Sequence, residues 1–132
     1  VADYKPASLE RQKIKKSSGN AMELHLIQNQ DILKTVANLE NRPFTVGFAA
    51  ETENVIEHAR TKLAAKNLDM IIANNVADTS IGFNSDHNET TIITRIISGK
   101  NTRITEEHQT KMSKENLSRK IIDLIAEQTV EA

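Results

Sequence analysis

The sequence predicts an α/β fold in which a doubly wound sheet is covered by helices. Residues 44–50 and 70–73 form short, nearly continuous apolar runs, as strands buried on both faces do. Between them, residues 52–66 show helical spacing of apolar side chains. Two buried parallel strands joined by a crossover helix make a βαβ unit, and this unit is the centre of the predicted fold.

The preceding segment predicts another strand and helix. Residues 1–6 are expected to be extended, because Pro6 disfavours a helical backbone at the residue before it. Residues 23–28 alternate in part between apolar and polar side chains, which indicates a strand. Asn29 is a candidate N-cap for a helix over residues 30–40, which Pro43 brings to an end. The resulting strand–helix order favours a doubly wound sheet.

The segment after residue 75 predicts a loop, a hairpin and a last helix. Residues 76–88 are rich in turn formers, and loops that follow strands often carry binding residues. Residues 89–97 and 102–106 are β-prone and flank a hairpin turn containing Gly99. Ser113 is a candidate N-cap for an amphipathic helix over residues 116–128.

The predicted hairpin has an edge whose role the sequence leaves open. An uncovered strand edge rich in isoleucine and threonine invites a second strand, which suggests a homodimer. Alternatively, the hairpin only caps its own sheet.

Composition limits the class of protein. The 132 residues suit one domain, and 38% hydrophobic and 27% charged side chains are typical of a globular chain. A net charge of −1 and few aromatic residues argue against nucleic acid as a partner. No stretch has the length of a membrane helix. The absence of cysteine excludes disulfides and thiolate chemistry within the chain and fits a reducing compartment. The start on VADYKP leads us to expect a fragment or a processed piece.

The predicted central helix carries a candidate binding stripe. At 100° per residue, Val55, Ala59, Lys62 and Lys66 share one face, which is apolar at its start and cationic at its end. The lysines either reach solvent from the margin of a buried face or bind a polyphosphate near the strand ends.

Two further residues fit a phosphate site. Lys13 belongs to a basic cluster before a turn-rich tract, which is either a solvated loop or a lid that places a cation over phosphate. Asp3 could hold a divalent ion that bridges phosphates. The usual glycine-rich phosphate loops are missing, and the four histidines show no metal-ligand spacing.

Taken in order, the motifs VADYKP, KIKK, GFAAET, IIANN and GFNSDHN resemble the C-terminal half of bacterial phosphopantothenate–cysteine ligases. The resemblance implies a Rossmann-like, three-layer fold and a cytoplasmic homodimer that serves coenzyme A biosynthesis. It implies that CTP, accompanied by Mg²⁺, activates 4′-phosphopantothenate as an acyl-cytidylate, which the amine of cysteine converts to an amide. It also implies an upstream decarboxylase part containing FMN.

The resemblance also assigns roles to particular residues. Lys13 would be the catalytic lysine of a flexible lid, and Asp3 a nucleotide-site aspartate that also binds the metal ion. The nucleotide would contact these two residues together with Gln30, Asp31, Ile32, Leu33, Phe48, Lys62 and Lys66.

The chain would then be the C-terminal part of a single ligase domain. We expect a terminal segment and lid over residues 1–22, a nucleotide-binding part over 23–88, and the hairpin and last helix over 89–132. Asn75 departs from the family pattern, which often has aspartate there. The family's amino-terminal half is absent, so we expect the chain alone to be inactive. Two alternatives are a non-catalytic nucleotide-binding or dimerisation module and a piece of a dinucleotide-dependent oxidoreductase.

Overall fold

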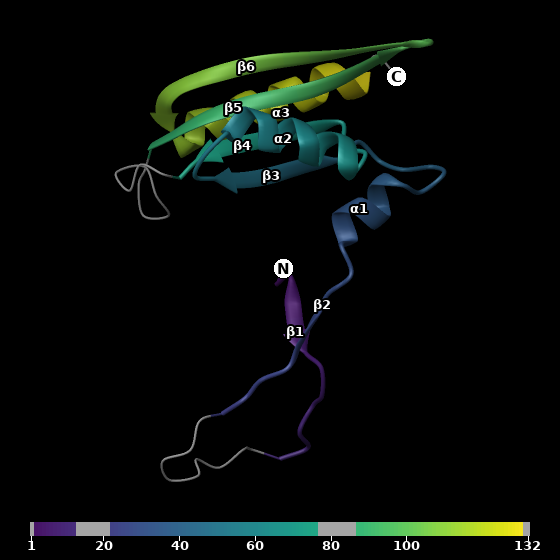
Figure 1. Ribbon diagram of the computed structural model, residues 1–132. Coiled ribbons are helices and arrows are strands. Elements are labelled where there is room, and N and C mark those ends of the chain that lie inside the picture. The colour runs from purple at the N-terminus through teal and green to yellow at the C-terminus, as the bar shows by residue number, and fades with distance from the viewer. Residues whose placement is uncertain (1, 13–21, 77–86, 131–132) are drawn as a thin grey trace.

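A four-stranded mixed sheet with the strand order β3-β4-β5-β6 forms the body of the protein (Figure 1). The structure, a computed structural model, describes residues 2–12, 22–76 and 87–130. β3 and β4 are parallel, whereas β4 pairs antiparallel with β5 and β5 antiparallel with β6. The strands comprise β3 (Val46–Glu51), β4 (Met70–Asn75), β5 (His87–Ser98) and β6 (Asn101–Ser113).

The predicted βαβ unit is confirmed. β3 and β4 are joined by α2 (Val55–Ala65), and their register pairs Val46 with Met70. The helix begins three residues later than predicted, because Asn54 adopts a left-handed backbone with φ 46°. Asparagine tolerates this conformation better than most residues do, so the helix starts directly after it.

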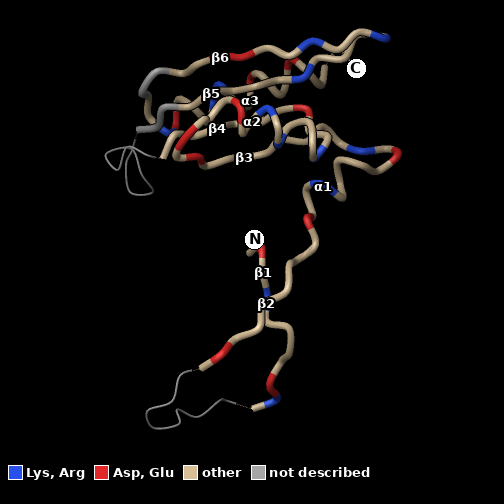
Figure 2. The backbone as a smooth tube through the Cα atoms, viewed as in Figure 1, with Lys and Arg blue, Asp and Glu red and all other residues tan. Residues whose placement is uncertain are grey.

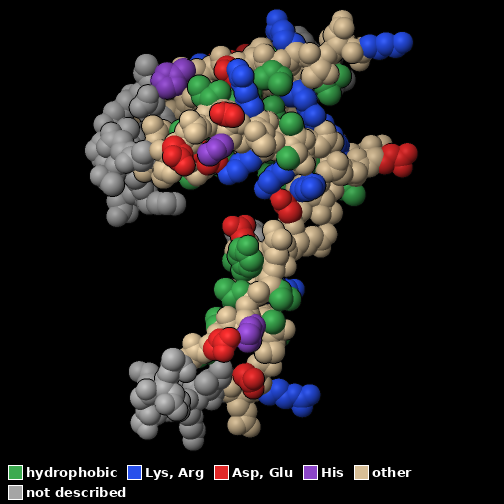
Figure 3. All heavy atoms as spheres, viewed as in Figure 1, with side chains coloured by type: hydrophobic (Ala, Val, Ile, Leu, Met, Phe, Trp, Pro, Cys, Tyr) green, Lys and Arg blue, Asp and Glu red, His purple; other side chains and the backbone are tan. Residues whose placement is uncertain are grey.

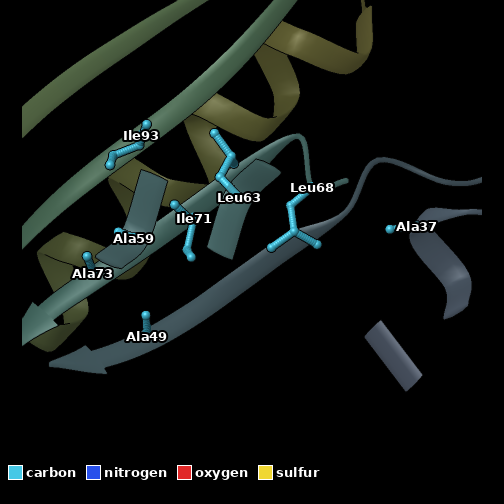
Figure 4. Packing of buried hydrophobic residues seen from close by; sticks show 8 residues of the cluster. All are labelled: Ala37, Ala49, Ala59, Leu63, Leu68, Ile71, Ala73 and Ile93. Carbon is cyan, nitrogen blue, oxygen red and sulfur yellow. The ribbon is translucent and has the colours of Figure 1, made fainter. Parts of the chain in front are cut away.

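Helices cover both faces of the sheet, as predicted. Along β4 and β5, Ile71, Ala73 and Ile93 pack on α2, as Figure 4 shows, because alternate side chains of a strand point to one face. The intervening Met70, Ile72 and Ile92 pack on α3 (Lys114–Val130). No helix in the described part of the chain is both long enough and apolar enough to cross a bilayer.

The predicted hairpin is confirmed and is longer than expected. β5 and β6 pair from His87 to Ser113, and Gly99 turns the chain with φ 60°. The N-cap prediction at the last helix also holds, since the Ser113 hydroxyl accepts a hydrogen bond from the Asn116 N–H at 3.3 Å. β3 and β6 therefore form the two edges of the sheet.

The amino-terminal segment departs from the prediction of one continuous doubly wound sheet. β1 (Tyr4–Pro6) and β2 (Leu26–Gln28) pair antiparallel in a separate ribbon, which lies apart from the body (Figure 1). The predicted strand over residues 23–28 is thus shorter and lies outside the main sheet. Its side chains are exposed, so no buried face fixes its place in the body. The short helix α1 (Ile32–Ala37) joins this ribbon to β3.

A buried ion-pair network fixes the entry to β4. Asp69 is 7% exposed and accepts two hydrogen bonds of 2.5 Å from the Arg42 guanidinium. It also accepts from the Thr45 backbone N–H at 2.8 Å, while Arg95 of β5 lies 3.6 Å away. Burial alone would raise the pKa of Asp69, but the hydrogen bonds from Arg42 and Thr45 outweigh it and lower the pKa. The network therefore joins the starts of β3 and β4 to the hairpin.

Candidate functional site

A pocket of about 380 Å³ lies where the amino-terminal ribbon meets α1 and the end of α2. Figure 3 shows a surface deeply hollowed between ribbon and body, with basic and acidic side chains gathered at their junction. Figure 2 shows charges of both signs around α1. The pocket is lined by Ala2, Asp3, Gln28, Asn29, Gln30, Asp31, Ile32, Leu33, Val36 and Lys66.

Asp31 positions both the helix and a cation at this pocket. It is the N-cap of α1, and its Oδ1 accepts a hydrogen bond from the Lys34 backbone N–H at 2.9 Å. Its Oδ2 lies 3.0 Å from the Lys66 ammonium. The hydrogen bond from Lys34 and then the one from Lys66 lower the pKa of Asp31, so the carboxyl stays ionised near neutral pH.

Asn29 holds the amino-terminal ribbon against the same pocket. Its backbone N–H donates to the Asp3 carbonyl at 2.8 Å, and its side-chain amide donates to the Ala2 carbonyl at 2.8 Å. These bonds bring the exposed Asp3 to the pocket wall. Asn29 was predicted to be the N-cap of the helix, and this is wrong, because its side chain is used by the ribbon and Asp31 caps instead.

The rest of the wall is mainly apolar. Leu33 packs on the buried cluster between α2 and the sheet, which anchors α1 to the body. Ile32 precedes it and is 58% exposed, so it offers an apolar surface toward the pocket. Gln30 is held by a hydrogen bond from its amide to the Thr35 hydroxyl at 3.2 Å. An apolar wall with a few fixed polar groups is typical of a small-molecule binding site.

Lys66 and Lys62 lie one turn apart on α2 but take different partners. Lys66 is the C-cap of the helix and lines the pocket. Lys62 lies outside the pocket lining, and its ammonium pairs with Glu51 at the end of β3. Both lysines pair with carboxylates and still expose 46% and 35% of their side chains, so solvation at the margin of the face and phosphate binding both stay open.

Phe48 lies on the other face of β3. Its neighbours Gly47 and Ala49 are buried on the α2 side, so alternation directs the Phe48 side chain toward the face that α3 covers. It is 71% exposed and does not line the pocket. The predicted lid lysine, Lys13, lies outside the described residues, as does most of the predicted loop over 76–88.

The structure therefore brings together most, but not all, of the predicted site. The pocket brings together the predicted aspartate, the residues that open α1 and one of the two lysines. These residues are Asp3, Gln30, Asp31, Ile32, Leu33 and Lys66. Glu51 and Asn29 were missed by the sequence reasoning. A carboxylate directly after a buried strand was the available signal for Glu51, whereas nothing in the sequence pairs Asn29 with residues 2 and 3.

Comparison with known protein families gives one match over nearly the whole chain. The model of the "DNA/pantothenate metabolism flavoprotein C-terminal domain" matches residues 1–129. The Coenzyme A biosynthesis bifunctional protein CoaBC of Vibrio cholerae is 54% identical over 94 residues, which cover 70% of this chain and 24% of that protein. CoaBC of Escherichia coli K12 is 50% identical over 91 residues, or 67% of this chain and 22% of that protein.

Solved structures show the same fold. The C-terminal domain of a CoaBC protein superposes with a TM-score of 0.68 at 29% identity, covering 100% of this chain and 52% of that one. A DNA/pantothenate metabolism flavoprotein from Streptococcus pneumoniae gives a TM-score of 0.60 at 20% identity and is similar in fold alone, covering 95% of this chain and 58% of that one. The chain spans about a quarter of the length of the curated relatives it matches.

Proposed function

Because this chain belongs to the family of the DNA/pantothenate metabolism flavoprotein C-terminal domain, we propose that it is part of a phosphopantothenate–cysteine ligase of coenzyme A biosynthesis. The ligase would join 4′-phosphopantothenate to cysteine in the cytoplasm at the expense of CTP. The observation that carries the proposal is the pocket in which Lys66 and Asp31 meet, because it lies within the matched segment and unites a cation with an apolar wall.

We assign the pocket to CTP. Ile32 and Leu33 supply apolar surface for the cytosine ring, and the Gln30 amide lies beside them. Lys66 would bind the phosphates, and Lys62 would reach them from the preceding turn of α2. Lysines placed where pyrophosphate leaves stabilise the charge that builds up on it. Phe48 remains a proposed nucleotide contact, from the other face of β3.

Lys13 is proposed to act from a lid. A cation that arrives only on closure would add to the charge stabilisation while water is excluded from the acyl-cytidylate. Cysteine would then attack the acyl group, forming the amide and releasing CMP. The decarboxylase part with FMN would lie outside this chain.

Asp3 fits a magnesium ion held mainly by substrate. Mg²⁺ retains water and takes one or two carboxylates together with phosphate oxygens. Asp3 is an exposed carboxylate on the pocket wall, which suits such a ligand. No group of three or more histidine, cysteine or acidic side chains that could hold a metal occurs among the described residues. When bound, the ion would neutralise charge on the triphosphate.

The amino-terminal half of the ligase domain is proposed to complete both the sheet and the site. β3 is an edge strand that pairs parallel with β4, and parallel strands are normally covered within a larger sheet. We propose that the missing half adds parallel strands beside β3, giving the Rossmann-like sheet. It would accompany this chain as preceding sequence or as a separate chain, and we call the combination the reconstituted ligase.

A homodimer through β6 is a second proposal. β6 is the other edge of the sheet and offers an extended backbone over Asn101–Ser113. Ile104 of β6 is 51% exposed, so the edge strand is also apolar in part. A role as a non-catalytic dimerisation module would use the same edge but would not require nucleotide.

Nucleotide choice tests the proposal. Calorimetry of the reconstituted ligase with CTP, with and without Mg²⁺, and with NAD or NADP separates the ligase from the alternatives. Binding of CTP that Mg²⁺ strengthens supports the ligase, whereas preferential binding of NAD or NADP supports an oxidoreductase. Absence of any nucleotide binding supports the dimerisation module.

A further inference from the structure

Glu51 ends β3 with its carboxylate directed at α2. Its backbone is fixed by pairing with Asn75 of β4 and by the hydrogen bond that the Val76 N–H donates to its carbonyl at 2.9 Å. Its side chain is only 12% exposed. A strand-end backbone held on β4 and a nearly buried side chain leave this carboxylate little freedom to move.

The two oxygens of the Glu51 carboxylate contact two different residues of α2. Oε1 lies 2.5 Å from the Lys62 ammonium, and Oε2 lies 3.4 Å from Nδ1 of His58. The hydrogen bond from Lys62 is the main cause of the lowered pKa of Glu51, which keeps the carboxylate ionised. Lys62, in contrast, is 46% exposed and sits on a flexible four-carbon stem.

The same arrangement recurs one turn later on α2. There Lys66 pairs with Asp31, which is fixed as the N-cap of α1. Each lysine of the predicted stripe is therefore held by a carboxylate that belongs to the end of another element. An ammonium held by one carboxylate keeps further N–H donors for a second anion.

We propose that Glu51 is a positioning residue that holds Lys62 ready for the phosphates of the nucleotide. The inference rests on the proposed function, because it concerns the same nucleotide site. A free lysine loses rotamer entropy when it binds an anion, whereas a lysine already held in place loses less. Glu51 touches no substrate in this scheme and acts only through Lys62.

A double-mutant cycle tests this inference in the reconstituted ligase. Calorimetry would measure the Kd of CTP with Mg²⁺ for the wild type, Glu51→Gln, Lys62→Gln and the double variant. Each single substitution is expected to raise Kd roughly tenfold, as for the loss of one charged hydrogen bond. The double variant is expected to match Lys62→Gln within about twofold, because Glu51 has nothing left to position.

Two further variants separate charge from fold. Glu106→Gln removes a β6 carboxylate that pairs with Arg60 of α2, the helix that also carries Lys62. This variant is expected to leave the Kd of CTP unchanged. Glu51→Asp keeps the charge within reach of the flexible lysine and is expected to stay within about threefold of the wild type. Glu51→Asp also keeps the inference testable if Glu51→Gln does not fold.

The possible failures are distinguishable. A wild type that does not bind CTP would contradict the proposed function itself. Wild-type binding with an unchanged or lower Kd in Glu51→Gln would overturn the positioning role alone, as would additive losses in the double variant or an equal loss in Glu51→Asp. An unchanged Kd in Lys62→Gln would also overturn it while leaving the pocket at Lys66 intact.

Discussion

The Lys66 ammonium lies 3.0 Å from Oδ2 of Asp31, so the end of α2 is tied to the start of α1. This contact crosses the junction between the amino-terminal segment and the body, and both residues line the same pocket. Asp31 is 39% exposed and Lys66 35% exposed, so the pair remains accessible to an anionic ligand. The contact is therefore both a structural link and part of the proposed nucleotide site.

Replacing Lys66 by glutamine is predicted to weaken CTP binding in the reconstituted ligase. The loss should be about 1–3 kcal/mol, the range for a hydrogen bond to a charged group. Lys120→Gln is a matched control. Lys120 of α3 is similarly exposed and pairs with Glu107 of β6, away from the pocket. Calorimetry that finds wild-type affinity for CTP in Lys66→Gln would contradict the proposal that Lys66 binds the nucleotide.

Replacing Asp31 by alanine is predicted to destabilise α1. Loss of the N-cap hydrogen bond should lower the free energy of unfolding by about 1 kcal/mol. Asp31→Asn keeps a good N-cap but removes the charge that holds Lys66, so it should lose only the ion-pair contribution and remain more stable than Asp31→Ala. Urea denaturation of both variants separates the two roles, and equal losses in alanine and asparagine would contradict the assignment of the cap.

The same residue gives a pH dependence with a definite sign. The pKa of Asp31 is lowered in the folded protein, so its contribution is present above the ordinary aspartate value. That contribution is lost as the pH falls through the lowered pKa. The stability difference between wild type and Asp31→Ala should therefore shrink in acid, and a difference that grows there would contradict the sign.

Asp69→Asn is predicted to be the most destabilising of these changes. Asp69 is nearly buried, and removal of its charge leaves the Arg42 guanidinium without its partner at a cost of about 3 kcal/mol. Glu115→Gln is the control, since it breaks an exposed pair with Arg119 that should contribute less than about 1 kcal/mol. Urea denaturation showing equal losses would contradict the role given to the buried network.

The sequence predicted the parts of the fold that local pattern determines. The apolar runs of β3 and β4, the crossover helix, the turn at Gly99 and the cap at Ser113 depend on spacing within a few residues. The strand in residues 23–28 was wrongly predicted to join the main sheet. Partial alternation indicates a strand, but it does not determine which strand pairs with it.

The candidate site was predictable only in part for the same reason. The stripe of Lys62 and Lys66 follows from helical angles, but the carboxylates that hold them come from other elements. Asn29 and Asp31 are both good N-caps, and the choice between them depends on the distant ribbon and on Lys66. Phe48 belongs to β3, the strand that ends in Glu51, but strand alternation places its side chain on the other face of the sheet.

Dimer formation through β6 is predicted at micromolar concentration. An unpaired strand edge in the described sheet can pair with its symmetry mate and satisfy backbone groups on both copies. Sedimentation velocity of the reconstituted ligase should show a species of twice the monomer mass. A clean monomer would support the alternative that the hairpin only caps its own sheet.

The central claim is that the pocket between α1 and α2 serves a CTP-dependent ligase. Its most direct test is pyrophosphate release by the reconstituted ligase in the presence of CTP, Mg²⁺ and 4′-phosphopantothenate. We expect release that requires phosphopantothenate and falls in Lys66→Gln but not in Lys120→Gln. Absence of release from a properly assembled protein, or release that Lys66→Gln leaves unchanged, would contradict the assignment of this pocket.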